Sequence, residues 1–137
     1  MELEPRYQEV LKRHVAAETV HDMDGTLATL TGDCAFEDVP YGVTHRGRDG
    51  ARAFYERWWS AFGIAPSRSR RYVPDATTLI VETHFVGRHV GAWEGVAPTG
   101  RSIDLPVAIV VTFANGLMSG ERFYYDRATL MKQLGAD

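Results

Sequence analysis

The sequence has only one cysteine, Cys34, among its 137 residues. A chain with a single thiol forms no internal disulfide and no zinc site built on several cysteines. This composition fits a reducing compartment, and we expect a cytoplasmic protein. The first residues, 1–8, are charged where a signal peptide would be apolar, and this pattern predicts no export signal.

Long apolar runs are also missing. The longest uninterrupted apolar stretch covers residues 107–111. A membrane-spanning helix needs roughly 20 apolar residues. We therefore expect no membrane partner.

Basic residues show no excess, and common cofactor motifs are absent. Lys and Arg number 15 against 18 Asp and Glu, which gives a formal charge of -3, whereas nucleic-acid binders usually carry a basic stripe. The one basic cluster, Arg68, Arg70 and Arg71, is interpreted as a solvated loop face. Neither a glycine-rich nucleotide motif nor a three-ligand set for zinc or iron is evident. The sequence predicts no nucleic-acid partner, no cofactor and no metal.

The residues that are present predict one domain over 1–137, with helices before strands. Apolar spacings of three and four predict a helix over about 5–20 and a short helix over 26–30, capped by Asp22 or Asp24. A third helix begins at 47–50 with Asp49 as its expected cap. Between them, residues 34–38 are predicted to form a short strand, followed by a turn at 40–42.

From Tyr72 onward, β-branched and aromatic residues dominate. They predict strands over 76–91, 102–113 and 117–125, with a hairpin at Asn115-Gly116. Helices followed by antiparallel strands predict an α+β fold with a curved sheet over the helices. The stretch 105–113 is apolar at successive positions, so both its faces should be covered, one by the helices and one by a second subunit. We expect a homodimer.

Two segments carry a resemblance to a known family. The segment 87–101, which ends in Pro-Thr-Gly-Arg, and the ending Asp126-x-x-x-Leu130-x-x-Gln133-Leu134-Gly135 resemble the SnoaL-like polyketide cyclases. These belong to the nuclear transport factor 2-like superfamily, and the resemblance covers nearly the whole chain. It implies a cone-shaped barrel, in which a curved antiparallel sheet wraps on three N-terminal helices.

The N-terminal half also resembles ketosteroid isomerase of the same superfamily. His14-Val-Ala-Ala, Asp22-Met-Asp-Gly and Phe36-Glu-Asp38 follow that enzyme's spacing. The resemblance implies that an aspartate at the Asp38 position moves a proton from carbon, while the residue at the His14 position holds the enolate oxygen. Ile109 stands near the position of the enzyme's second, protonated aspartate, so that acid is missing here.

Asp126 is the leading candidate for a catalytic residue. The resemblance to the cyclases implies that it is the general acid and base of an intramolecular aldol closure. A carboxylate can take a proton from carbon if an apolar pocket raises its pKa toward neutrality. Asp126 is equally well placed to cap a helical segment over 127–134. The catalytic hypothesis depends on its side chain projecting into a dry chamber.

Asp38 and His14 complete the predicted catalytic set. Asp38 is interpreted as a catalytic base or as a turn residue before Pro40. His14 lies on the apolar face of the first helix and is either a core residue or a group that polarises a substrate carbonyl. Expected substrate-binding residues could wall a pocket for a flat, ring-bearing ligand; they are Tyr41, Trp58, Phe62, His89, Trp93, Glu121 and Tyr124. Alternation along 117–125 does not decide whether Glu121 or Tyr124 faces inward.

The predicted function is cofactor-independent proton transfer at carbon on a hydrophobic carbonyl substrate, giving aldol ring closure or isomerisation, in the lyase or isomerase class. One alternative is an epoxide hydrolase or dehydratase of the same fold. Such an enzyme would hold a water between Asp38, Asp126 and an arginine, Arg88 or Arg122. Another alternative is a non-catalytic protein that binds a small molecule.

Overall fold

The computed structural model describes residues 1–136, which form helices and one six-stranded sheet. In chain order the elements are α1 (Pro5–Thr19), α2 (Met23–Leu27), β1 (Leu30–Asp38), the 3-10 turn η1 (Val39–Tyr41), β2 (Val43–Arg46), α3 (Gly47–Phe62), β3 (Ala65–Asp75), β4 (Thr78–Arg88), β5 (Ser102–Ala114), β6 (Leu117–Tyr124) and α4 (Arg127–Gln133). None of the described helices is long and apolar enough to cross a membrane.

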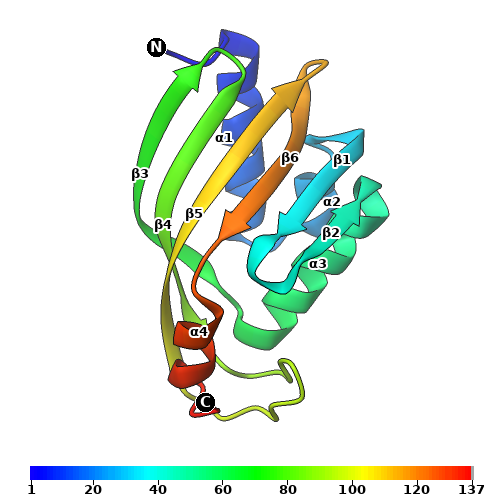
Figure 1. The fold of residues 1–137 in the computed structure, drawn as a ribbon. Coiled ribbons are helices and arrows are strands. Elements are labelled where there is room, and N and C mark those ends of the chain that lie inside the picture. The colour runs from blue at the N-terminus through cyan, green and yellow to red at the C-terminus, as the bar shows by residue number, and fades with distance from the viewer. Residues whose placement is uncertain (137) are drawn as a thin grey trace.

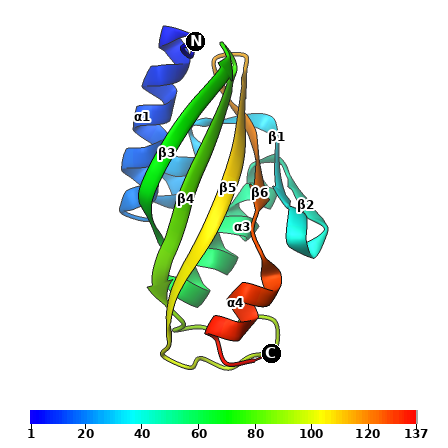
Figure 2. The ribbon, with the colours of Figure 1, turned by 60° about the vertical axis from the view of Figure 1, so that its left-hand side comes forward.

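The sheet is curved and carries the first three helices on its concave face (Figures 1 and 2). Its strand order is β2-β1-β6-β5-β4-β3. All neighbours are antiparallel except β1 and β6, which are parallel. The predicted α+β fold with a curved sheet over helices is confirmed. The sheet stays unclosed between β2 and β3, and its β1–β6 pair is a parallel exception to the expected antiparallel arrangement.

Helix boundaries follow from capping residues. Pro5 occupies the first turn of α1, where its missing N–H is not needed. The Asp22 side chain accepts a hydrogen bond from the Gly25 N–H, so α2 begins three residues before the predicted start. The expected cap of α3 is wrong, because the helix already begins at Gly47 and Asp49 lies within its first turn.

The edge strands are the elements that sequence patterns missed. No strand was predicted over β2, and β3 runs through the arginine cluster that was interpreted as a loop face. β3 is polar at most positions and is interrupted by a register shift near Arg68, whose φ is +56°. Charged, irregular edge strands resist pairing with other chains, but they lack the apolar alternation by which strands are recognised.

The core lies between α3 and the concave face of the sheet. Phe54, Trp58 and Phe62 recur every four residues along α3 and are buried. The Phe54 ring stacks on Phe123 of β6 with ring centroids 4.5 Å apart. This packing fixes α3 against β6, and the space that remains open lies beside it, toward α1.

The convex face of β5 is only half covered by the described chain. Residues that point to the concave side are buried, whereas Ala108 and Val110 on the convex side are half-buried. In Figures 1 and 2 the helices α1, α2 and α3 all lie on the opposite, concave face of the sheet. The second covering layer expected from the sequence would have to come from outside the chain.

Candidate functional site

An apolar cavity of about 140 Å³ lies between α1, α3 and the concave face of the sheet. Its walls include Trp58, Leu79, Phe85, Ile109, Val111 and Phe123. A volume of this size resembles the roughly 150 Å³ apolar cavities that accept one aromatic ring. The cavity therefore suits a compact hydrophobic group.

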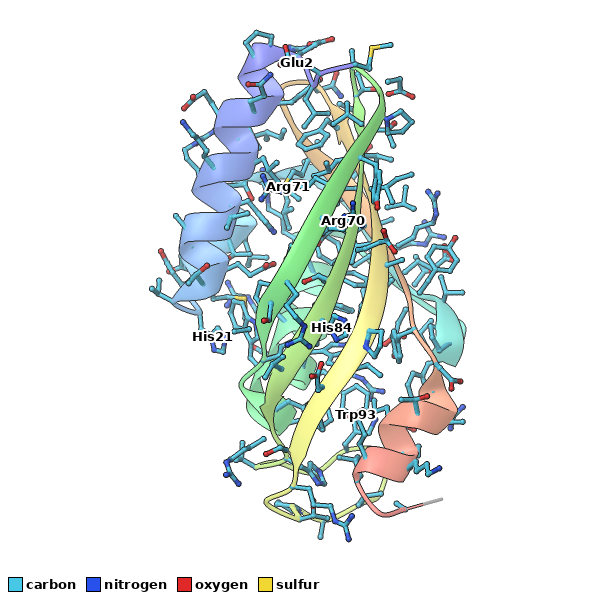
Figure 3. The ribbon with its side chains drawn as sticks, turned by 90° about the vertical axis from the view of Figure 1, so that its left-hand side faces the viewer. Glu2, His21, Arg70, Arg71, His84 and Trp93 are labelled. Atoms are coloured by element: carbon cyan, nitrogen blue, oxygen red, sulfur yellow. The ribbon has the colours of Figure 1, made fainter. Side chains whose placement is uncertain are left out.

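The cavity adjoins the protein surface along α1. A groove between α1 and β3 shares Leu11, Val15, Arg71 and Leu79 with the cavity lining. Figure 3 shows Arg71 between α1 and β3. A ligand that enters by this groove passes an arginine before it reaches the apolar walls.

Four polar side chains meet at one wall of the cavity, and we call them the polar cluster: His14, Glu18, Tyr55 and Glu121. His14 and Glu18 are four residues apart on α1 and so share one helix face. Tyr55 comes from α3. Glu121 comes from β6 and lies on the same side of the strand as Phe123. It is buried, with only 7% of its surface exposed.

Hydrogen bonds fix the orientation of the His14 ring. The hydroxyl of Thr29 donates to the Thr26 carbonyl at 2.6 Å, so it can only accept from His14 Nδ1 at 2.8 Å. The network therefore assigns a proton to Nδ1. The other ring nitrogen, Nε2, lies 3.1 Å from a Glu18 carboxylate oxygen and 3.2 Å from the Tyr55 hydroxyl.

The Tyr55 hydroxyl connects the two carboxylates. It lies 3.0 Å from Glu18 Oε2 and 3.4 Å from Glu121 Oε2. Burial, together with both carboxylates, raises the pKa of Tyr55 well above its ordinary value. Tyr55 therefore remains a hydrogen-bond donor at neutral pH.

The two glutamates differ in charge because only one of them pairs with the histidine. Burial alone raises the pKa of Glu18, but the adjacent imidazole of His14 outweighs this effect and the pKa of Glu18 is lowered. Burial likewise opposes a charged His14, but Glu18 raises its pKa overall. At Glu121, burial outweighs the lowering by the more distant His14, and the Glu18 charge adds to burial, so the pKa of Glu121 is raised to about 7.

His14, Trp58 and Glu121 are the predicted site residues that the structure places at this cavity. The inward direction of Glu121 also decides the open question of strand alternation. Tyr124 lies on the other face of β6 and is 43% exposed. The expectation that Tyr124 contributes to the same pocket is wrong.

Asp126 lies outside the cavity, and the prediction that it projects into a dry chamber is wrong. It is exposed and caps α4, accepting hydrogen bonds from the Thr129 N–H at 3.3 Å and the Thr129 hydroxyl at 2.6 Å. The hydrogen bond from the Thr129 hydroxyl is the main cause of a lowered pKa at Asp126. β6 ends at Tyr124, so the chain has already left the concave face when it reaches Asp126. The capping interpretation is confirmed.

Asp38 is buried but does not line the cavity. Its carboxylate accepts a hydrogen bond from the Tyr125 hydroxyl at 2.5 Å, and burial raises its pKa. It borders a separate surface cleft together with Tyr41, His45 and Arg57. The structure therefore separates His14 and Asp38, which the resemblance to ketosteroid isomerase had brought to one site.

The remaining aromatic candidates pack beside α3 rather than around the cavity. The Trp93 indole N–H donates to the Tyr41 hydroxyl at 3.0 Å, and the Trp93 and Phe62 rings lie 5.0 Å apart. His89 is buried against Phe62, and its Nδ1 accepts from the Thr99 N–H at 3.1 Å. These contacts hold the 89–101 loop to α3, so the expected pocket role of Phe62, His89 and Trp93 is wrong for this cavity.

Glu18 and Tyr55 are the cluster members that sequence reasoning did not select. The spacing of His14 and Glu18 was a usable signal, because residues four apart on a helix meet. Their partner Glu121 is far away in the chain. Ligand atoms of His14, Glu18 and Glu121 all lie within 4.8 Å of one another, so these residues could hold a metal ion. No three-ligand set was evident from the sequence, because only the fold brings Glu121 to the two residues of α1.

Comparison with known proteins agrees with this architecture. A proposed polyketide cyclase from Xanthomonas campestris has a TM-score of 0.84 at 21% identity, over 94% of this chain and 96% of its own. A second proposed polyketide cyclase, from a Silicibacter species, has a TM-score of 0.84 at 23% identity, over 97% of each chain. AclR, a proposed hydroxylase from Streptomyces galilaeus, has a TM-score of 0.77 at 17% identity, over 93% of this chain and 80% of its own.

Similarity at these identities establishes the fold alone. No curated protein sequence matches the chain significantly. The model of the SnoaL-like polyketide cyclase family, however, matches residues 8–134. The protein therefore belongs to the SnoaL-like polyketide cyclase family.

Proposed function

We propose that this protein is an enzyme that transfers protons at carbon on a hydrophobic, carbonyl-bearing small molecule, with Glu121 as general base and acid. One observation carries the proposal: the Glu121 carboxylate lies at the wall of an apolar cavity with its pKa raised to about 7. A group whose pKa lies near the working pH can both take up and return a proton. Ring closure by an aldol reaction, one way to cyclise a polyketide, requires both steps.

The polar cluster provides a role for each of its members. The apolar part of the substrate occupies the cavity, and ionised Glu121 takes a proton from the carbon between two carbonyls. The Tyr55 hydroxyl donates a hydrogen bond to the enolate oxygen that forms. The imidazole of His14, whose pKa is raised by Glu18 against the effect of burial, lies beside the Tyr55 hydroxyl. The enolate carbon then bonds to a second carbonyl carbon, and the resulting alkoxide takes the proton back from Glu121.

The cavity lining favours this proposal over the water chemistry of epoxide hydrolases or dehydratases. The residues considered for holding a water, Asp38 and Asp126 with Arg88 or Arg122, do not line the cavity. A non-catalytic binding protein needs an apolar space, but it needs no buried carboxylate that titrates near neutrality. Glu121 therefore favours an enzyme over a non-catalytic binding protein.

Oligomeric state belongs to the same proposal. We infer a homodimer that is formed through the convex face of the sheet, where Ala108 and Val110 of β5 are half-buried. Such an interface leaves the concave cavity of each subunit open to its own substrate.

Deuterium uptake tests the proposed chemistry without knowledge of the natural substrate. A hydrophobic aryl ketone with slow background exchange is incubated in D2O with the protein, and exchange at the carbon next to the carbonyl is followed by NMR. We expect Glu121→Gln to slow the catalysed exchange by about a hundredfold or more. Glu56→Gln, a matched change on the exposed side of α3, and Asp126→Asn should leave it unchanged.

Equal exchange by the wild type and Glu121→Gln would remove Glu121 from the mechanism. Loss of exchange in Asp126→Asn alone would restore the catalytic role first expected for the helix cap. Circular dichroism on each variant checks that the fold is retained.

A further inference from the structure

With a neutral His14 imidazole, the polar cluster contains more hydrogen-bond acceptor atoms than hydrogen-bond donors. The Nδ1–H of His14 donates its hydrogen bond to the Thr29 hydroxyl. The single proton of Tyr55 has a closer acceptor in Glu18, at 3.0 Å, than in Glu121, at 3.4 Å. Among the described residues, Glu121 has no other hydrogen-bond donor, although it is more than nine-tenths buried. A buried carboxylate without a donor is costly, and the deficit is met by a proton or by another cation.

Charge at the cluster fits a divalent cation. When both carboxyl groups are ionised and the imidazole is neutral, the side chains of Glu18 and Glu121 together place two negative charges in a mostly apolar surrounding. No lysine or arginine forms an ion pair with either glutamate in the described chain. One divalent ion would neutralise both carboxylates and would leave the imidazole uncharged, as a metal ligand must be.

The geometry of the cluster is that of a three-ligand metal site with one open side. The candidate ligand atoms of His14, Glu18 and Glu121 lie within 4.8 Å of one another. Thr29 holds the Nδ1–H of His14, which directs the Nε2 lone pair into the cluster, as outer hydrogen bonds do for metal-bound histidines. Because all three residues line the cavity, a fourth ligand position faces the space for substrate or water.

We propose that His14, Glu18 and Glu121 bind one divalent first-row transition-metal ion at the wall of the cavity. One imidazole nitrogen and carboxylate oxygens suit zinc, manganese and ferrous iron more than soft cuprous ions. The proposal goes beyond the function proposed above and does not rest on it. The ion and the catalytic proton compete for the same atoms, so metal binding falls as the pH is lowered.

Zinc titration of the full chain tests the proposal. Protein stripped with a chelator is titrated with ZnCl2 by calorimetry at pH 7.5, in a buffer that does not bind zinc. We expect one ion per chain with a dissociation constant of about 10 μM or lower, and a binding affinity at least tenfold lower in Glu121→Gln. Glu121→Gln removes a buried charge without changing the side chain's shape, so it should fold. Glu18→Gln is the second variant and should have the same effect.

A matched control addresses zinc bound at the surface. His84 lies 2.7 Å from Asp104 on the convex face, far from the cluster in the sheet, and His84→Gln removes this alternative histidine site. We expect the affinity of His84→Gln to equal that of the wild type. Visible absorption of bound Co2+, a spectroscopic substitute for zinc, should weaken in the two glutamate variants and persist in His84→Gln.

Three results would overturn the proposal: far less than one zinc per chain, equal affinity in the wild type and both glutamate variants, or loss of binding in His84→Gln. The assay contains no substrate, so its result is separate from the deuterium experiment. A protein that exchanges deuterium and binds no zinc would keep the proposed function and lose this site.

Discussion

Neighbouring side chains set the charge of the cavity residues more than residue type does. Glu18 and Glu121 meet the same tyrosine hydroxyl, yet the pKa of Glu18 is lowered and that of Glu121 is raised to about 7. The difference follows from contact with His14, which Glu18 makes directly at 3.1 Å. Two identical carboxyl groups can therefore take separate roles, one as a fixed charge and one as a proton carrier.

Stability of the folded protein should depend on pH through Glu121. Its pKa rises from an ordinary value of 4.5 to about 7 on folding, so between these values the folded chain binds more protons than the unfolded chain. The free energy of unfolding then decreases as the pH rises through this range. We expect Glu121→Gln to be more stable than the wild type above pH 7, on the order of 3 kcal/mol, with the difference vanishing near pH 4.5. Urea unfolding of both proteins from pH 4.5 to 8 measures it; parallel curves would contradict the raised pKa.

The Tyr55 hydroxyl should tune the proton affinity of Glu121. Its hydrogen bond favours the charged carboxylate and lowers the pKa of Glu121, against the larger effect of burial. In Tyr55→Phe we therefore expect the midpoint of the pH–rate profile for deuterium exchange to move to higher pH, besides a lower maximal rate. A lower rate with an unmoved midpoint would show that Tyr55 acts on the substrate alone.

Secondary-structure elements were predictable where one face is apolar and the other is polar. The spacing of Phe54, Trp58 and Phe62 identified α3, and the β-branched runs identified β4 and β5. β3 was not predicted because it is an edge strand that buries few apolar side chains, so its sequence shows no apolar alternation. The site residues were also only partly predictable. His14 was selected from the apolar face of its helix, but its proximity to Glu121 depends on how β6 pairs within the sheet.

The error at Asp126 concerned both strand alternation and the end of the strand. Even a strand that continued by two residues would have placed Asp126 on the outer face with Tyr124. Instead β6 stops at Tyr124, and the Asp126 side chain binds the first turn of α4. Local sequence allowed both outcomes, since Asp is common at helix caps and in active sites.

The α4 cap gives a measurable stability effect. Asp126→Ala removes the acceptor for the Thr129 N–H and hydroxyl, and we expect a loss of about 1 kcal/mol in the free energy of unfolding. Asp126→Asn keeps a capping oxygen and should lose far less. Thermal unfolding of the two variants compares them, and a larger loss in the Asn variant would mean that the negative charge, rather than the cap, is what matters.

In the whole molecule, the convex face of the unclosed sheet is the surface that we infer to contact a second subunit. Inward residues of β5 are buried by this chain, whereas Val110 on the other face is half-buried. We expect Val110→Arg to convert the dimer to a monomer, because it would place a second positive charge opposite Arg122 of β6 within the interface. Light scattering coupled to gel filtration measures the mass. A wild type that is monomeric at micromolar concentration would contradict the inferred dimer, and an unchanged dimer in the variant would place the interface elsewhere.

The parallel pairing of β1 with β6 joins an early segment to a late one, so most of the protein must be synthesised before this pair can form. While the ribosome is still making β5 and β6, the aromatic face of α3 lacks Phe123, on which Phe54 stacks, and His14 lacks its neighbour Glu121. The future cavity is then an open apolar trough on a nascent chain, and the carboxylate of Glu121 is the last of its polar groups to arrive. The site is therefore completed only after β6 has been synthesised and has paired with β1 and β5.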